Sequence, residues 1–171
     1  MNKGKIFETA IKNSVPKDCY YFRLHDPAQS FDQSSTLRFS LPNPYDCLLF
    51  CYPTLFALEL KSTESTSMGF WREDFVDKTK KQTFMIKKNQ IKGLDTASQF
   101  KGVVAGFLLN WRKTNHTYFW NINDFLEFTN MLDKKSFNEE DVISHNGMLI
   151  EQTLKKVNYK YNLENLCQLS N

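Results

Sequence analysis

Residues 44–61 read PYDCLLFCYPTLFALELK and hold two apolar runs that meet at a break containing Pro53. Two such runs around a proline-containing break predict a β-hairpin. With Tyr52 and Pro53 at the turn, counting outward along both strands pairs Asp46 with Glu59. The Cβ atoms of residues paired in this way lie roughly 5 Å apart.

Two carboxylates in this position repel each other unless a cation lies between them. Strand alternation puts Lys61 on the same face as Glu59, whereas Leu58 and Leu60 point the other way into a core. Two acids able to bind a divalent metal, with a lysine beside them, form the minimal apparatus for metal-assisted phosphodiester cleavage.

A second interpretation of these residues remains open. An Asp at a strand start and a Glu and Lys on a solvated sheet face commonly contribute only to solubility, and Lys61 can simply neutralise the two acids. The neighbouring residues favour a functional site, because charges in a buried sheet are rarely left without a partner. The acids lie among large apolar side chains, namely Leu48, Leu49, Phe50, Leu55, Phe56 and Leu58.

At 171 residues, with 41% hydrophobic and 24% charged residues, the chain has the composition of one globular domain. Its net charge of +3 permits nucleic-acid binding without arguing for it. Lysine clusters of this kind either neutralise phosphates or form a solvated helix face. The clustered residues are Lys78, Lys80, Lys81, Lys87, Lys88 and Lys92, and later Lys155, Lys156 and Lys160.

The four cysteines, Cys19, Cys47, Cys51 and Cys167, form no Cys-x-x-Cys pair and no zinc-ligand spacing. Cys47 and Cys51 alternate with Asp46, so they are expected to face away from the acids as small buried side chains. This usage is typical of a reducing compartment. The sequence also lacks an apolar signal segment and any stretch of transmembrane length. The protein is therefore expected in a bacterial cytoplasm, or in that of a phage-infected host, with no membrane partner.

The order of predicted elements indicates a mixed α/β sheet with helices on its faces. Helices are predicted over 4–14 and 84–99, after Asn121 or Asn123, and after a capping box at 136–139. Strands are predicted over 19–24, 103–111 and 117–120, beside the hairpin of 46–61. The polar stretch 25–44 is expected to be a long loop. Residues 62–79, with Trp71 and Arg72, are expected to be irregular, either closing over DNA or serving as a connector.

Other chemistries have little support in the sequence. His25, His116 and His145 stand alone, without metal-ligand spacing. The chain has no Gly-x-x-x-x-Gly-Lys loop for ATP and no Gly-x-Ser-x-Gly elbow for a hydrolase triad.

The order of elements and motifs resembles the PD-(D/E)XK nuclease superfamily, and within it the RecU-type Holliday junction resolvases of phages and Gram-positive bacteria. The resemblance covers about residues 4–128 and is specific only through the combination of its motifs. These motifs are Gly4-Lys5-Ile6-Phe7-Glu8, Arg38-Phe39-Ser40, Asn43-Pro44-Tyr45-Asp46, Ala57-Leu58-Glu59-Leu60-Lys61-Ser62-Thr63, Asn89-Gln90-Ile91, Gly106-Phe107-Leu108-Leu109-Asn110 and Thr117-Tyr118-Phe119-Trp120.

The resemblance implies a restriction-endonuclease-like fold, one nuclease domain over residues 1–171, and a loop or reduced stalk at about 25–45. It further implies that Asp46, Glu59 and the Leu60 carbonyl bind Mg²⁺ or Mn²⁺, with Lys61 as the catalytic lysine. Glu8 and Gln90 are implied to be helix residues of the same site. The residues expected to contact DNA are Arg38, Lys61, Lys87 and Lys88.

The function implied is resolution of four-way DNA junctions by paired nicks, carried out by a homodimer alongside recombination proteins. A two-fold junction must be cut twice, and a two-fold dimer offers two suitably related sites. Two alternatives stay open: a related nuclease that cuts flap or duplex DNA, and a non-catalytic junction-binding protein that modulates recombination.

Overall fold

The structure is a computed structural model that describes residues 3–24, 42–76, 79, 82–131 and 133–170. Arg38 and most of the predicted loop or stalk lie outside the described residues. So do three of the clustered lysines, Lys78, Lys80 and Lys81. Among the described residues, no helix is long and apolar enough to cross a membrane.

A six-stranded mixed sheet forms the centre of the protein. Its strands, in spatial order, are β1 (Tyr20–Arg23), β2 (Cys47–Cys51), β3 (Thr54–Thr63), β5 (Val103–Trp111), β6 (His116–Asn121) and β8 (Met148–Leu149). The central pair, β3 and β5, is parallel, and the other neighbours are antiparallel. The predicted fold class, a mixed central sheet flanked by helices, is therefore confirmed.

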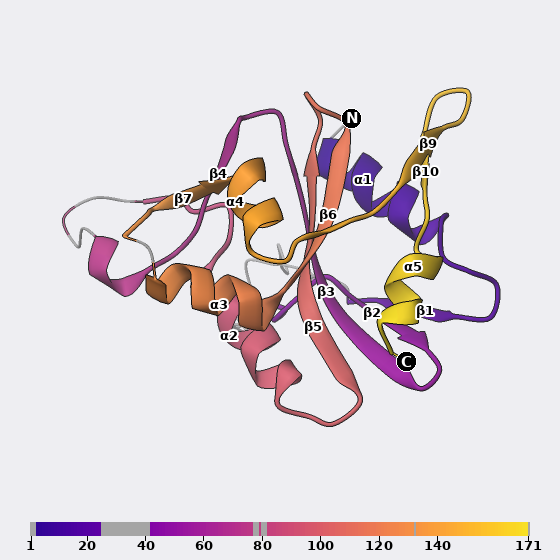
Figure 1. The fold of residues 1–171 in the computed structure, drawn as a ribbon, viewed down its shortest axis with the longest axis horizontal. Coiled ribbons are helices and arrows are strands. Elements are labelled where there is room, and N and C mark those ends of the chain that lie inside the picture. The colour runs from indigo at the N-terminus through magenta and orange to yellow at the C-terminus, as the bar shows by residue number, and fades with distance from the viewer. Residues whose placement is uncertain (1–2, 25–41, 77–78, 80–81, 132, 171) are drawn as a thin grey trace, which may run out of the picture.

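Helices and two small sheets cover both faces of this sheet (Figure 1). The helices are α1 (Lys3–Lys12), α2 (Lys88–Ser98), α3 (Ile122–Met131), α4 (Glu139–Ser144) and α5 (Glu164–Cys167), with 3₁₀ turns η1 (Glu73–Phe75) and η2 (Gln168–Ser170). One small sheet pairs β4 (Ser67–Gly69) with β7 (Ser136–Asn138), and the other pairs β9 (Gln152–Leu154) with β10 (Tyr159–Tyr161).

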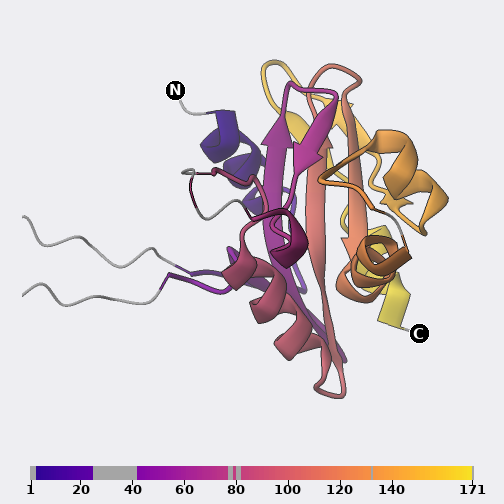
Figure 2. The same cartoon turned by 90° about the vertical axis from the view of Figure 1, so that its left-hand side faces the viewer.

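Alternation along β3 divides the apolar residues into two cores. Phe56, Leu58 and Leu60 pack on one face with residues of α1, β10 and α5. Ala57 packs on the opposite face with residues of α2, α3 and α4, the face toward the viewer in Figure 2. Glu59 has the same parity as Ala57, so its side chain belongs to the face covered by α2.

The hairpin register follows the sequence prediction. Cys47 pairs with Leu58 and Cys51 with Thr54, and the turn contains Tyr52 and Pro53, joined by a cis peptide bond. The burial of Leu58 and Leu60 is confirmed as well, with 1% and 7% of their surfaces exposed.

The capping box predicted at Ser136 and Glu139 is wrong in its residues. Asn138 caps α4 instead, because its side chain accepts a hydrogen bond from the Asp141 N–H at 2.9 Å. Asp141 in turn accepts from the Asn138 N–H at 3.0 Å. Ser136 lies in β7, where pairing with β4 uses its backbone. This pairing also gives a strand within residues 62–79, which the sequence predicted to be irregular.

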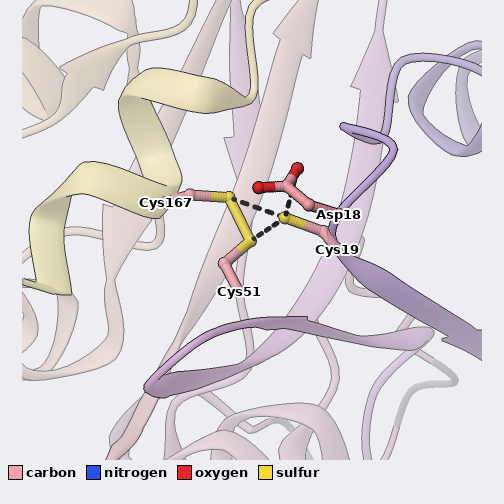
Figure 3. The surroundings of a disulfide bond; sticks show 4 residues. All are labelled: Asp18, Cys19, Cys51 and Cys167. Carbon is pink, nitrogen blue, oxygen red and sulfur yellow. Dashed lines mark hydrogen bonds between the residues drawn. A yellow bond between two sulfur atoms is a disulfide. The ribbon is translucent and has the colours of Figure 1, made fainter.

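The cysteine prediction needs a correction too. The sequence predicted free thiols without any grouping, yet Cys51 and Cys167 form a disulfide, with Cys19 beside it (Figure 3). The bonded pair is 116 residues apart in the chain, so its proximity comes from the docking of α5 on the sheet. The predicted burial of Cys47 and Cys51 is confirmed.

Candidate acidic site at the β2–β3 hairpin

Asp46 lies immediately before β2 and is fixed to β3 at two points. Its N–H donates to the Leu58 carbonyl at 3.0 Å, and its Oδ2 accepts from the Leu60 N–H at 2.8 Å. The register of the hairpin, extended by one residue, places Asp46 opposite Glu59. The structure thus brings the predicted acidic pair together. The Leu60 N–H fixes the Asp46 side chain, whereas metal binding by the Leu60 carbonyl stays a prediction.

Glu59 is almost completely buried in the middle of β3, with 1% of its surface exposed. Its Oε1 accepts hydrogen bonds from the Lys61 ammonium, at 2.8 Å, and from the Gln90 side chain. Its Oε2 is also buried and has no hydrogen-bond partner among the described residues. A buried oxygen without a partner is costly, so this carboxylate is suited to bind a further group.

The electrostatics of the pair follow from this burial. Burial raises the pKa of Glu59 to about 8, although the Lys61 ammonium opposes the rise. Asp46 raises the pKa further through its negative charge. Near neutral pH, without a bound cation, Glu59 therefore holds a proton much more readily than an exposed glutamate does.

Gln90 connects Glu59 to the N-terminus of α2. Its Nε2 donates to Glu59, while its Oε1 accepts from the backbone N–H of Lys87 at 2.9 Å. The first turn of a helix carries unpaired N–H groups and partial positive charge, which favour phosphate groups. The two lysines predicted to contact DNA, Lys87 and Lys88, lie at this exposed helix end.

Trp71 belongs to the same region, although sequence reasoning gave it no firm role. The Lys88 ammonium lies 4.1 Å from the centre of the Trp71 ring, at cation–π distance. The Trp71 N–H donates to the Ile86 carbonyl at 2.9 Å, and this bond joins the segment to the residues just before α2. An aromatic residue beside a lysine cluster was the only sequence signal for this contact.

Two residues of α2 hold the segment that leads into Asp46. Asn89 Nδ2 donates to the Asn43 carbonyl at 3.0 Å. Gly93 approaches Pro44 so closely that a Cβ at this position would lie 2.4 Å from the Pro44 Cβ and 2.8 Å from its carbonyl oxygen. Sequence reasoning missed the role of Gly93, since nothing along the chain indicates that α2 packs on this segment.

Glu8 lies on α1 and forms an ion pair with Arg23 of β1. Arg23 pairs across the sheet with Cys47, the residue after Asp46. Burial and, to a smaller extent, the negative charges of Asp46, Glu59 and Glu8 raise the pKa of the Cys47 thiol to about 12. The structure therefore places Glu8 on the α1 side of the sheet, in an ion pair with Arg23, and its membership of the Asp46–Glu59 site stays a prediction.

The residues present fit a hard divalent cation. Asp46 and Glu59 offer carboxylate oxygens, the ligand type that Mg²⁺ and Mn²⁺ prefer. The buried Glu59 Oε2 without a described partner supplies the independent observation for this fit. A cation between the two side chains would also relieve the repulsion that raises the pKa of Glu59.

Comparisons with known proteins give a family. The chain is 33% identical over 179 residues to the SPbeta prophage-derived uncharacterized protein YotM of Bacillus subtilis (strain 168), across 97% of this chain and 85% of YotM. The chain belongs to the same family as YotM. No family model matches the sequence. Among solved structures, Hjc of Archaeoglobus fulgidus, a Holliday junction resolvase, matches with a TM-score of 0.46 and 13% identity over 77% of this chain and 83% of Hjc.

Proposed function

We propose that the protein is a Mg²⁺- or Mn²⁺-dependent endonuclease, formed by one nuclease domain over residues 1–171, that resolves four-way DNA junctions during recombination. The observation that carries the proposal is Glu59, a buried carboxylate with an oxygen that lacks a described partner, placed beside Asp46 and Lys61. The proposed substrate, a four-way DNA junction, comes from the order of motifs, which resembles that of RecU-type resolvases.

Each residue of the site has a role in this proposal. When bound, the divalent cation polarises the scissile phosphate and makes a water easier to ionise. Asp46 and Glu59 bind this cation, and Lys61 stabilises the negative charge that develops on the phosphate. Gln90 holds the Glu59 carboxylate in position from α2. A role for Glu8, which forms an ion pair with Arg23, is proposed on the resemblance alone.

The N-terminus of α2 offers a place for the DNA backbone. Lys87 and Lys88 are exposed there, on the helix that contacts Glu59 through Gln90. Cations at a helix N-terminus neutralise phosphates without reading a base sequence. Such contacts suit an enzyme that selects the branched shape of its substrate, and a further contact from Arg38 is proposed on the resemblance alone.

A homodimer is part of the proposal, and the sheet edge is its favoured interface. Tyr20 and Phe50 are paired neighbours on β1 and β2, and Phe22 lies on the same face of the sheet. Their surfaces are 62%, 39% and 47% exposed, respectively. A contiguous exposed apolar patch of this kind is typical of an interaction site. Two chains related by a two-fold axis present two sites to a two-fold junction.

The test is cleavage of a labelled four-way junction by the full chain in Mg²⁺, compared with flap and linear duplex substrates. Asp46→Asn keeps the shape of the side chain and removes its charge, so cleavage is expected to fall roughly 10²–10³-fold. Binding of the junction with Mg²⁺ removed is expected to stay within a factor of about three. Asp133→Asn, at an exposed carboxylate outside the site, is the matched control.

The outcomes separate the alternatives. Preferential cutting of flap or linear DNA identifies a related nuclease of different specificity. Tight junction binding without metal-stimulated cleavage identifies a non-catalytic recombination protein. Normal cleavage by Asp46→Asn contradicts the assignment of the site.

A further inference from the structure

Three cysteine sulfur atoms meet at one point, away from the acidic site. Cys19 precedes β1, Cys51 ends β2 and Cys167 ends α5, and their sulfur atoms lie within 4.8 Å of one another. The Cys19 sulfur is 2.9 Å from that of Cys51 and 3.7 Å from that of Cys167 (Figure 3). A disulfide needs two of these residues, so it leaves the position of Cys19 unexplained.

A carboxylate lies beside the cluster, in which Cys19 and Cys167 are only partly buried. The Asp18 carboxylate lies 4.0 Å from the Cys19 sulfur. Asp18 and Glu164 also line an open pocket of about 680 Å³, together with Lys17, Lys155 and Lys160. The Asp18 carboxylate beside three sulfur atoms favours a cation.

We propose that the reduced protein binds one Zn²⁺ ion through Cys19, Cys51 and Cys167, with Asp18 as the fourth ligand. Three sulfurs and one oxygen or nitrogen form a familiar closed, tetrahedral zinc site. With Zn–S bonds of about 2.3 Å, tetrahedral geometry separates the sulfur atoms by about 3.8 Å. The 3.7 Å between Cys19 and Cys167 already fits this spacing.

The proposal accounts for the redox state. The Cys51–Cys167 disulfide takes up two electrons and two protons from a dithiol reductant to give two thiols. Binding of Zn²⁺ to the three cysteines then releases their three protons to solvent. In a reducing compartment, the zinc form replaces the disulfide form as the connection between α5 and the sheet.

This site is separate from the acidic site and independent of the proposed function. Asp46 and Cys51 are five residues apart on the hairpin strand, which corresponds to roughly 17 Å. The elements joined at the cysteines are the start of β1, the hairpin end of β2 and the C-terminal helix α5. The zinc ion therefore has a structural role, in which it fixes α5 to the edge of the sheet.

The experiment measures zinc by mass spectrometry in the full chain purified in a phosphine reductant, before and after dialysis against a chelator. About one zinc ion per chain is expected, together with a lower melting temperature after chelation. Replacement by Co²⁺ is expected to give a thiolate-to-cobalt charge-transfer absorption. Absence of zinc after purification and after addition of Zn²⁺, or an intact mass lighter by two hydrogens in reductant, overturns the proposal.

Variants separate a zinc site from a disulfide with a bystander thiol. Cys19→Ser leaves the Cys51–Cys167 pair intact, so it is expected to lower zinc affinity at least tenfold and to abolish the effect of the chelator. Asp18→Asn keeps all three thiols and tests the fourth ligand if Cys19→Ser folds poorly. Cys47→Ala, at the remaining cysteine, is expected to keep its zinc. Zinc retained by both Cys19→Ser and Asp18→Asn contradicts the proposed ligands.

Discussion

Gln90, at the start of α2, donates a hydrogen bond to the buried carboxylate of Glu59, and its other end accepts from the backbone N–H of Lys87. One side chain thus connects the centre of β3 to the helix end at which phosphate binding is proposed. Groups that orient a metal ligand from outside the coordination sphere commonly affect metal affinity or activity by 10–100-fold.

Gln90→Ala is therefore expected to reduce junction cleavage by about 10–100-fold, because Glu59 loses the donor that orients it. The Mg²⁺ concentration needed for half-maximal cleavage is expected to rise as well. Gln99→Ala is the matched control, since Gln99 lies at the other end of α2 and hydrogen-bonds only within the helix end among described partners. Equal activity of the two variants contradicts a role for Gln90 in positioning.

The pH dependence of stability provides a second prediction. The pKa of Glu59 is raised from 4.5 to about 8 in the folded protein, so folding favours its protonated form. Without metal, the contribution of Glu59 to stability is greatest below pH 4.5 and is lost progressively as the pH rises toward 8. The loss of stability amounts to a few kcal/mol, because each unit of pKa shift corresponds to about 1.4 kcal/mol. The coupled titration of Asp46 and Glu59 keeps the loss below the value for an isolated group.

Urea unfolding in a chelator at pH 5, 6.5 and 8 checks this prediction. The free energy of unfolding of Glu59→Gln minus that of the original chain is expected to increase with pH, because glutamine carries no proton that can be lost. Addition of Mg²⁺ at pH 8 is expected to reduce this difference, since the ion binds the charged form. A difference that is constant over the three pH values contradicts a raised pKa of Glu59 in the folded protein.

Gly93 gives a third prediction, because its contact with Pro44 fixes the segment before Asp46. A methyl group at this position collides with the Pro44 backbone, so Gly93→Ala is expected to destabilise the fold by about 1–3 kcal/mol. It is also expected to lower cleavage by displacing Asp46. Gly69→Ala is the control, since the nearest atom to its added Cβ is 3.9 Å away. Thermal melts and cleavage rates of the two variants, measured together, distinguish displacement of Asp46 from general loss of folded protein.

The acidic pair was predictable from the sequence because a hairpin has few degrees of freedom. The Tyr52–Pro53 break and the apolar alternation fix which residues pair and which face they share. Asp46, Glu59 and Lys61 were therefore placed correctly from local pattern alone. Gln90 was placed through the resemblance, because contact between α2 and β3 has no signature in either segment.

Contacts between distant segments account for what the sequence did not predict. The helical backbone at position 93 does not require a glycine. The close packing of Pro44 against this position explains why the residue is Gly93. The spacing of Cys19, Cys51 and Cys167 resembles no ligand motif, yet the fold brings their sulfur atoms together. In each case the information lies in how elements pack rather than along the chain.

The last prediction concerns the exposed aromatic residues at the sheet edge. Phe22 lies on β1, which pairs only with β2 among the described strands, and its surface is 47% exposed. If this edge forms the dimer, Phe22→Asp introduces two like charges near the two-fold axis and removes apolar contact area. The variant is expected to change from dimer to monomer in light scattering at micromolar concentration and to bind junctions more weakly.

Val157→Asp is the control for this change, because Val157 is 84% exposed but lies in the turn between β9 and β10. It is expected to stay dimeric, and thermal melts of both variants verify that each is folded. A folded Phe22→Asp protein that stays dimeric shows that the two chains meet elsewhere. A monomeric original chain that still cuts junctions at two symmetrical positions contradicts the need for a dimer, because one acidic site must then act twice.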